Sequence, residues 1–572
     1  MFTTLPDFRR LLGRPRVLLA MLLIGAALFF LPNLADPFVS DDWHHLWIAG
    51  HRTQPLWAYF TTNYEGTTSG GSYRPLVNVL WAAVDAAGGG LSLFGRLFGH
   101  TVALVAHLLC VALVFLIGRM LVHGRRGTAL GALAALLFAL MPNHPEAVNW
   151  VGAASDPIAT AALLAGVLLY LDGHAALRLR WFHLVGPAAA MAVGLVAKET
   201  AIVLPAVIGL HALFNLHRPW RASLARVAAL LAPLALVAVA YLLVRYRATG
   251  LLYGYYGAER ISVDLMVATR TFLAIPVSQF LSGPARTHVM DALYRGIDTH
   301  AEAYLLAALV PGLLLLFRAR RRVWWLTASA IIAVVPVMQF GLNHLPGRWS
   351  DEGERYAYMP SAFGALLAAW AALALWKRVQ RSRPALVVVG LVLFVALAVQ
   401  LGQKNISWFE SSRFAEEVVR SWPEQIADQV FVYGLPDNLR GVPLWRNGFA
   451  QRLEAEGEQP SDLRVSDIRT VMDEPHGFWA NDGGDHFLYY SDPPEAGARD
   501  IVGPTPADRT PTSYGVLPWE TEFSIYALTY RHFAADAIAD PRPTTSDASA
   551  AFWMGDGWTM RPLSLREVEA VQ

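Results

Sequence analysis

Pairs and clusters of charged residues occur at the ends of long apolar segments, where they could bind or activate an anionic substrate. Asp41 and Asp42 stand side by side soon after the first apolar run, in the string SDDW. Two adjacent carboxylates repel each other, and a carboxylate that stays ionised beside a cation can act as a general base. The structural alternative is a solvated loop start in which Asp42 caps a short helix with the sequence WHHLWIAG.

Basic residues take comparable positions further along the chain. Arg74 precedes a proline, Lys198 separates two apolar segments, and Arg355 begins another apolar segment. The guanidinium of arginine offers a planar fork of donors that suits a phosphate group. Lipid-headgroup anchoring of Arg74 and helix-end capping at Lys198 are the structural alternatives. The candidate set also includes sequence neighbours of these basic residues, namely Glu199, Glu354 and Tyr356.

A polar connection between two apolar segments reads PNHPEAVNW, and Asp156 follows it closely. His144, Glu146 and Asp156 could bind a divalent metal, or they could form a hydrogen-bonded brace. Metal sites usually need more ligands than these residues supply, so a role in structure or in orienting a substrate is favoured.

The composition is that of a polytopic membrane protein. Of 572 residues, 55% are hydrophobic and 16% are charged, and the mean hydropathy is +0.36; soluble domains contain about 25% charged residues. Runs such as VLLAMLLIGAALFFL (17–31) are long enough, or nearly so, to cross the hydrocarbon core as helices. The net charge of +1 gives no broad basic surface for nucleic acid, and the single cysteine, Cys110, excludes an intrachain disulfide.

The apolar runs predict about 11 membrane spans. A further segment, 265–282, is apolar enough to cross but contains Arg270 and Pro276. If it crossed, the RARRR run at 318–322 would face outward, so we favour an interfacial or re-entrant helix. The predicted spans cover residues 17–32, 97–118, 128–142, 157–171, 184–197, 200–214, 227–246, 301–317, 323–341, 357–376 and 384–402.

Arginine placement predicts the orientation of these spans. Six connections hold 20 Arg and Lys residues between them, and the alternate connections hold few. The positive-inside rule therefore places the basic connections and the N-terminus in the cytoplasm. All the polar clusters named above then lie on the outer side, a coincidence that the span assignment did not use. The arginine-rich composition is typical of a bacterial chain, which indicates the bacterial plasma (inner) membrane.

Two domains are expected. Residues 1–402 form the transmembrane domain, which includes a long first outer loop at 33–96. Beyond residue 403 acidic residues, Pro and Gly increase and no span-length apolar run remains, which predicts a small extracytoplasmic α/β domain at 403–572. Strand patterns and one amphipathic helix pattern are found there, the strands at 428–436, 485–492 and 523–533 and the helix at 407–422.

The order of the motifs resembles that of the GT-C membrane glycosyltransferases. The resemblance is to the branch of transmembrane, tetratricopeptide-containing O-mannosyltransferases and their bacterial relatives, although no tetratricopeptide array follows the membrane part here. It covers about residues 15–402. The strings that carry it are SDDW (40–43), SYRPL (72–76), NHPEAVNWVGAASD (143–156), AKETAIVLP (197–205) and GERYAYMPS (353–361).

The resemblance implies a GT-C fold and transfer of a hexose, with mannose as one candidate, from a polyprenyl-phosphate-linked donor on the extracytoplasmic side. It implies that an acidic residue of the first outer loop is the base, which we assign to Asp42 first and Asp41 second. It places Arg74, Lys198 and Arg355 near the lipid phosphate. It gives His144, Glu146 and Asp156 a part in the architecture of the site. Because many enzymes of this kind work without metal, the resemblance also implies no metal and no cofactor.

The acceptor stays open among a glycan, a lipid and a protein. Two alternatives to catalysis also stay open: a non-catalytic member or a transporter or flippase-type protein for lipid-linked sugars, and an outer binding domain on an inert membrane part. A transporter more often shows paired repeats and broken helices at mid-membrane depth. The charged residues here cluster at one interface instead, which favours the glycosyltransferase.

Overall fold

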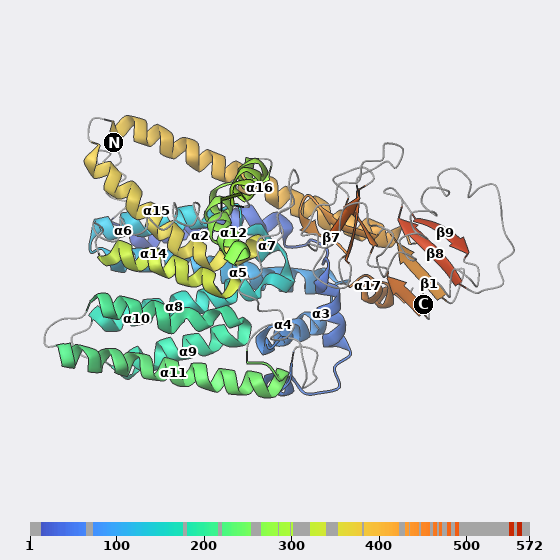
Figure 1. Ribbon diagram of the computed structural model, residues 1–572, viewed down its shortest axis with the longest axis horizontal. Helices are drawn as coiled ribbons and strands as arrows, with labels where there is room; N and C mark the ends of the chain where they lie inside the picture. The colour runs from blue at the N-terminus through green and yellow to red at the C-terminus, as the bar shows by residue number, and fades with distance from the viewer. Residues whose placement is uncertain are drawn as a thin grey trace. The chain divides into compact units, whose positions relative to one another are not determined.

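Most of the chain outside its C-terminal part is helical in the computed structural model (Figure 1). The structure describes residues 13–63, 72–175, 180–215, 220–252, 265–283, 285–297, 299–300, 321–338, 353–379, 382–422, 429–433, 435–445, 448–457, 462–465, 468–471, 477–481, 487–490, 548–553 and 558–562. The predicted span at 301–317 and the predicted strand at 523–533 lie outside the described residues.

The chain divides into two compact units. The first, called here the membrane unit, consists of Met1–Ala35 and Ile48–Trp408. The second, the C-terminal unit, consists of Asp36–Trp47 and Phe409–Gln572. The sequence grouped all of 33–96 with the membrane part, whereas Asp36–Trp47 packs with the C-terminal segment. The boundary at 402/403 stays a prediction.

The membrane unit is built from helices of unequal length. Its short helices are α7 (Pro145–Asn149) and the 3₁₀ turns η1 (Leu31–Asn33), η2 (Leu56–Phe60), η3 (Val151–Ala153), η4 (Glu199–Val203), η6 (Val335–Val337) and η7 (Glu354–Ala357). Its longer helices are α2 (Pro15–Phe30), α4 (Pro75–Ala86), α5 (Leu93–Leu121), α6 (Arg125–Ala139), α8 (Ser155–Ala175), α9 (Trp181–Ala197), α10 (Leu204–Phe214), α11 (Trp220–Thr249), α12 (Leu265–Phe280), α14 (Arg321–Val334), α15 (Tyr358–Arg378) and α16 (Arg383–Arg420).

Among the described residues, six helices are long and apolar enough to cross a membrane: Pro15–Asn33, Leu93–Leu121, Val151–Ala175, Ser223–Thr249, Glu354–Arg378 and Arg383–Arg420. Three shorter apolar helices accompany them, Pro75–Ala86, Trp181–Ala197 and Glu199–Phe214. The prediction of a polytopic α-helical membrane protein is confirmed. The number of spans stays a prediction, as does the interfacial or re-entrant position of α12, which is helical over 16 residues.

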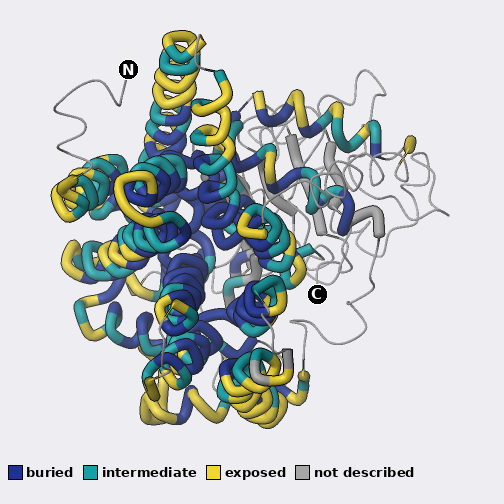
Figure 2. The backbone as a smooth tube through the Cα atoms, turned by 90° about the vertical axis from the view of Figure 1, so that its left-hand side faces the viewer, coloured by how far each residue is buried: buried dark blue, intermediate teal, exposed yellow. Residues whose placement is uncertain are grey.

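The outer faces of these helices are apolar, as contact with lipid requires. On α2 the exposed large side chains are Val17, Met21, Ile24 and Leu28, whose spacing of three and four residues places them on one helical face. Figure 2 shows buried positions on the inner sides of the helices and exposed positions on the outer sides. A continuous exposed apolar stripe would be unfavourable in water and is favourable in a bilayer.

The interior of the membrane unit is closely packed around α5, which contacts α6 and α8. A Cβ atom on Gly118 would lie 2.6 Å from the Cα atom of Gly131, and one on Gly131 would lie 2.2 Å from the carbonyl oxygen of Phe115. Small residues at this crossing therefore let the backbones of α5 and α6 approach each other, a common way of packing helices in membranes.

Helix α16 differs from the expectation. The sequence predicted a span at 384–402 and a separate helix at 407–422, whereas one uninterrupted helix runs from Arg383 to Arg420. Pro384 stands in its first turn, and the next proline in the sequence is Pro423. Because no proline intervenes, the backbone hydrogen bonds continue through the change from apolar to polar sequence.

The C-terminal unit combines strands with helices. Its helical parts are the start of α3 (Asp41–Gly50), the end of α16, and α17 (Phe449–Glu456). Within the described residues, one sheet has the order β4-β1-β8-β9 and a second has the order β3-β2-β5-β6-β7. Their bounds are β1 (Gln429–Tyr433), β2 (Leu435–Leu439), β3 (Val442–Pro443), β4 (Asp462–Val465), β5 (Ile468–Val471), β6 (Gly477–Asn481), β7 (Phe487–Tyr490), β8 (Ala548–Trp553) and β9 (Trp558–Pro562).

The first sheet is parallel at its centre, because β1 pairs in parallel with both β4 and β8. Val430 and Val432 of β1 are fully buried, so this strand contributes to the core of the unit. The strands predicted at 428–436 and 485–492 correspond to β1 with β2 and to β7. The prediction of a small α/β part at the C-terminal end is confirmed.

Candidate functional site

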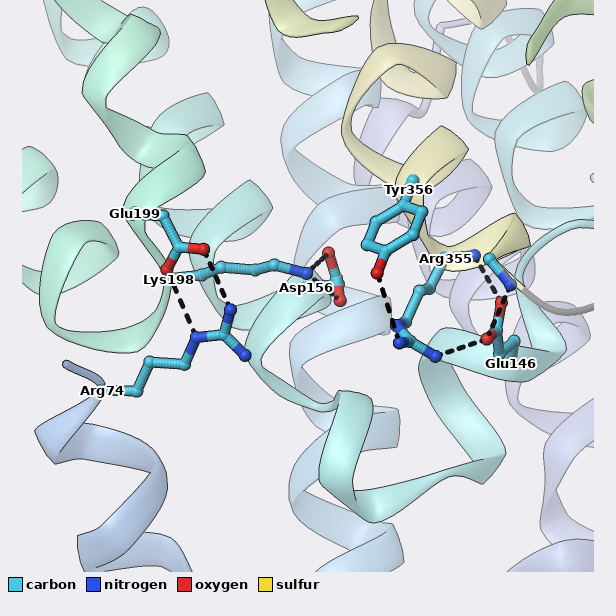
Figure 3. Close-up of polar contacts among 8 residues, drawn as sticks. Arg74, Glu146, Asp156, Lys198, Glu199, Arg355 and Tyr356 are labelled. Atoms are coloured by element: carbon cyan, nitrogen blue, oxygen red, sulfur yellow. Dashed lines mark hydrogen bonds and ion pairs between the residues drawn. The ribbon is translucent and has the colours of Figure 1, made fainter. Parts of the chain in front are cut away.

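Three cation–carboxylate pairs meet where helices of the membrane unit end (Figure 3). In the first, Arg74 directly precedes α4 and Glu199 begins η4. Nη2 of Arg74 lies 2.9 Å from Oε1 of Glu199, and Nε lies 3.3 Å from Oε2. This two-point contact uses the planar guanidinium fork, so it fixes both the position and the orientation of Arg74.

In the second pair, Lys198 lies between α9 and η4, and Asp156 lies in the first turn of α8. Nζ of Lys198 lies 2.6 and 2.7 Å from the two carboxylate oxygens of Asp156. Burial lowers the pKa of Lys198, the Asp156 carboxylate raises it, and the nearby Arg74 and Arg355 lower it further. The net direction is downward, and both Arg74 and Arg355 lie close enough to Lys198 to act on its charge.

In the third pair, Glu146 of α7 holds the turn that contains Arg355. The Nη1 atom of Arg355 lies 2.6 Å from Oε1 of Glu146, and the backbone N–H of Arg355 donates to Oε2 at 2.7 Å. The backbone N–H of Gly353 also donates to Oε1, at 3.1 Å. One carboxylate therefore fixes both the backbone and the side chain of the turn.

Aromatic rings join the second and third pairs. The ring of Tyr356 lies 5.4 Å from Nζ of Lys198 and 5.1 Å from the guanidinium carbon of Arg355. The ring of Trp150 lies 4.6 Å from that same guanidinium carbon. Cations at such distances are attracted by the faces of aromatic rings. Tyr356, which the sequence predicted as a site residue, thus lies between two of the cations, whereas Trp150 was not predicted.

The three cations differ in accessibility. The side chains of Arg74 and Arg355 are 24% and 20% exposed, whereas that of Lys198 is 5% exposed. The cluster therefore contains two partly exposed guanidinium groups and one buried ammonium group. Guanidinium and ammonium groups are the side-chain donors that bind phosphate by charge-assisted hydrogen bonds.

Glu354 takes a different environment from its neighbour Arg355. Its side chain is 1% exposed and forms ion pairs with Lys404 and with Arg286, whose Nε atom lies 3.2 Å from Oε1 of Glu354. Lys404 lies on α16, and Arg286 lies in the helical stretch 285–297. Glu354 was predicted to bind substrate, and here it ties the turn before α15 to these two segments. Lys404 and Arg286 were missed, although Lys404 is one of three lysines in the chain.

His144 lies in the interior beside the site. Its Nε2 atom is 2.9 Å from the hydroxyl oxygen of Ser361, and its ring packs against Phe138 and Tyr358. Burial, with a smaller contribution from His107, places the pKa of His144 well below its ordinary value, so the ring is neutral. Within the described part of the chain, no three His, Cys, Asp or Glu side chains gather as a metal site would require.

The acidic pair belongs to the C-terminal unit. Asp41 and Asp42 open α3, where Asp41 is half-buried and Asp42 is buried. Oδ2 of Asp42 accepts a hydrogen bond from the backbone N–H of Val39 at 3.3 Å. The structure thus brings seven predicted residues together in the membrane unit and holds the two predicted bases in the other unit. The seven are Arg74, Glu146, Asp156, Lys198, Glu199, Arg355 and Tyr356.

Part of the sequence is similar to a curated protein, the Protein O-mannosyl-transferase Tmtc1 of Drosophila melanogaster. The two are 32% identical over 192 residues, which cover 32% of this chain and 21% of Tmtc1. The expected resemblance is confirmed. The chain therefore matches about a fifth of the length of this relative. No protein-family model matches the chain.

Solved structures of low sequence identity also align with the chain. ArnT from Cupriavidus metallidurans, bound to undecaprenyl phosphate, is 13% identical with a TM-score of 0.40, and the alignment covers 78% of this chain and 89% of ArnT. The oligosaccharyltransferase of Archaeoglobus fulgidus in its apo form is 11% identical with a TM-score of 0.43, covering 78% of this chain and 64% of that one. Likeness at this level assigns no role to any residue.

Proposed function

We propose that this chain is a membrane glycosyltransferase that moves a sugar from a polyprenyl-phosphate-linked donor to an acceptor outside the cytoplasm. The observation that carries the proposal is the cluster of Arg74, Lys198 and Arg355, each fixed by its own carboxylate and two of them partly exposed. The similarity to Tmtc1 supports the same class of reaction. We place the protein in the bacterial inner membrane with its N-terminus in the cytoplasm.

In the proposed reaction the three cations bind the phosphate of the donor. When the bond between the anomeric carbon and the phosphate oxygen breaks, negative charge grows on the leaving polyprenyl phosphate. Cations that are already held in place stabilise this charge without reorganising, and electrostatic stabilisation of this kind is usually the largest contribution to catalysis. Glu199, Asp156 and Glu146 hold the cations, so removing one carboxylate should displace the cation that it holds.

The proposed base is Asp42, with Asp41 as the second candidate. Its carboxylate accepts the proton of an acceptor hydroxyl while the acceptor oxygen forms a bond to the anomeric carbon and polyprenyl phosphate leaves. A general base contributes about 10²- to 10⁴-fold to a rate. Asp41 is the more exposed of the two, so the two asparagine variants must be compared.

The name of the relative makes mannose the first donor sugar to test and a protein hydroxyl the first acceptor. A glycan and a lipid are the next acceptors to test, because a compact α/β unit and no tetratricopeptide array follows the membrane part here. The acceptor is bound outside the cytoplasm in each case.

The test is transfer by the full chain, purified and reconstituted in proteoliposomes with labelled polyprenyl-phosphate sugars. We expect transfer of one sugar with release of polyprenyl phosphate. Movement of a labelled lipid-linked sugar across the vesicle membrane with no cleavage of its phosphate bond would instead favour the transporter alternative. The Arg74→Ala, Lys198→Ala and Arg355→Ala variants should each transfer sugar more slowly, because each removes a cation that binds the donor phosphate.

A further inference from the structure

The segment that carries the acidic pair packs within the C-terminal unit, although the residues directly before and after it in sequence belong to the membrane unit. From its contacts we infer that the C-terminal unit positions the base, with Gly448 and Arg452 as positioning residues. This inference rests on the proposed function, because it assigns the C-terminal unit a part in the same reaction. It also gives a role to Gly448, which lies in the string WRNGF (445–449).

The first contact holds a strained residue directly before the pair. Ser40 has a φ of +50°, in the left-handed region that residues other than glycine rarely adopt. Its backbone N–H donates a hydrogen bond of 2.6 Å to the carbonyl oxygen of Leu444. Such strain persists only where the surroundings enforce it, and it concentrates at functional sites. Here a carbonyl group of the C-terminal segment helps to fix the backbone from which Asp41 and Asp42 follow.

The second contact is a close approach at Gly448, the residue directly before α17. Gly448 has a φ of +86°, and a Cβ atom on it would lie 2.5 Å from the carbonyl oxygen of Ser40. It would also lie 2.9 Å from the Cβ atom of Trp43 and 3.2 Å from the backbone nitrogen of His44. Backbone atoms cannot rotate away from such a clash. A side chain at position 448 would therefore displace the first turn of α3.

The third contact clamps Trp43, the residue that follows the pair. The guanidinium carbon of Arg452 lies 4.7 Å from the centre of the Trp43 ring, and the Arg452 side chain is completely buried. Nη2 of Arg452 lies 3.0 Å from Oε1 of Glu416 and 2.8 Å from Oε1 of Glu456. These two carboxylates orient the guanidinium, and the guanidinium in turn holds the indole ring.

A fourth contact lies one helical turn further along α3. The indole Nε1 of Trp47 donates a hydrogen bond of 2.7 Å to Oε2 of Glu454. Trp43 and Trp47 are four residues apart, so they lie on one side of α3. That side faces α17 and the residues before it, and the carboxylates at 41 and 42 are placed by its contacts. A displacement of about 1 Å at a reacting group can lower a rate about 10²-fold.

The experiment compares two glycines that flank α17. Gly448 precedes this helix and Gly457 follows it, and both have a positive φ, +86° and +78°. A Cβ atom on Gly457 meets nothing within 4 Å. Gly457→Ala therefore imposes the same kind of backbone strain as Gly448→Ala without the clash with Ser40, which makes it the matched control.

We expect Gly448→Ala to lower kcat about 10²-fold with little change in KM for the lipid-linked donor. The donor KM should stay nearly unchanged because the proposed phosphate-binding cations belong to the membrane unit. Gly457→Ala should retain kcat within about twofold, since it disturbs no contact of the acidic segment. Arg452→Met and Arg452→Lys provide a second pair of variants. The methionine should lower kcat, and lysine should restore part of it because a cation over the ring is retained.

Folding is checked by size exclusion and by the apparent Tm of each purified variant. If Gly448→Ala does not fold, Arg452→Lys and Glu454→Gln carry the test, since neither adds volume. A folded Gly448→Ala protein with the kcat of the wild type would overturn the inference. So would a rise in donor KM with unchanged kcat, because the C-terminal unit would then act on donor binding.

The design separates this failure from failure of the proposed function. If Asp42→Asn or Asp41→Asn removes transfer while Gly448→Ala does not reduce kcat, the glycosyltransferase proposal stands and the positioning role is lost. If the wild-type protein transfers no sugar from any labelled donor, both proposals are overturned.

Discussion

The cations of the membrane unit and the acids of the C-terminal unit are held in place by different means. Each cation is fixed by an opposite charge at 2.6 to 2.9 Å, as for Lys198 and Asp156 or Arg74 and Glu199. The acidic pair is held by the backbone N–H of Val39, which donates to Asp42, and by contacts of its neighbours, the backbone of Ser40 and the ring of Trp43. The difference matches the two proposed tasks.

A cation that stabilises a leaving phosphate can be paired in advance, because it needs only to keep its charge and its position. A base has to take a proton, so it is best oriented by groups around it that leave its chemistry unchanged. The comparison therefore predicts that the two regions control different kinetic constants. The predictions below test that division, from the largest effect to the smallest.

The largest effect is expected at the acidic pair. Asp42→Asn removes the proposed base without changing its size, and kcat should fall about 10²- to 10⁴-fold with donor KM nearly unchanged. Asp41→Asn is measured beside it to decide which carboxylate serves. Asp85→Asn, in the same outer loop but outside the SDDW string, is the control and should keep the activity of the wild type. Full activity of both motif variants would remove the base from the proposal.

The next effect concerns stability. Glu354→Gln leaves Lys404 and Arg286 without their buried carboxylate, and breaking a buried ion pair from one side costs about 3–5 kcal/mol. The apparent Tm of the purified protein should fall markedly. The control is Glu410→Gln, because Glu410 pairs with Arg440 at a site where both side chains are exposed, 47% and 44%. Exposed pairs contribute about 0–1 kcal/mol, so an equal loss in the two variants would contradict the bracing role of Glu354.

A smaller effect is expected at Arg355. Lysine keeps the charge but loses the planar fork, and charged hydrogen bonds contribute about 1.5–3 kcal/mol each. Arg355→Lys should therefore raise the donor KM about tenfold or more, as measured with a labelled polyprenyl-phosphate sugar. Arg378→Lys makes the same change at the far end of α15, where the side chain is exposed, and should leave the KM as it is.

The smallest effect belongs to the outermost contact of the acidic segment. Glu454→Gln replaces the charged acceptor of the hydrogen bond from Trp47 with a neutral one. A neutral hydrogen bond still contributes about 1 kcal/mol, so we expect kcat to fall no more than a few-fold. The effect should lie on kcat and spare the donor KM. A change in donor KM with unchanged kcat would contradict the division of kinetic roles between the two regions.

Much of the candidate site could be predicted from residue types and their places at the ends of apolar runs. Lys198 and Glu199 are adjacent in sequence, but in the structure Lys198 pairs with Asp156 and Glu199 with Arg74. Neighbouring side chains point in different directions, so their partners come from other helices. Glu354 and Arg355 diverge in the same way. Which carboxylate meets which cation depends on helix packing, which a local pattern does not encode.

Hydropathy predicted the helical membrane part, but no sequence pattern predicted that the SDDW segment packs with the C-terminal segment. Its partners, Leu444, Gly448 and Arg452, lie some 400 positions along the chain. A contact over that separation leaves no periodicity to detect. The positive φ of Ser40 could not be predicted, because serine is an ordinary residue directly before a helix.

The most direct test measures kcat and donor KM for Asp42→Asn and Arg355→Lys side by side in proteoliposomes, with the donor that the wild-type protein uses. The division of roles predicts that Asp42→Asn loses kcat and keeps KM, and that Arg355→Lys raises KM. Equal changes of the same constant in both variants would contradict it.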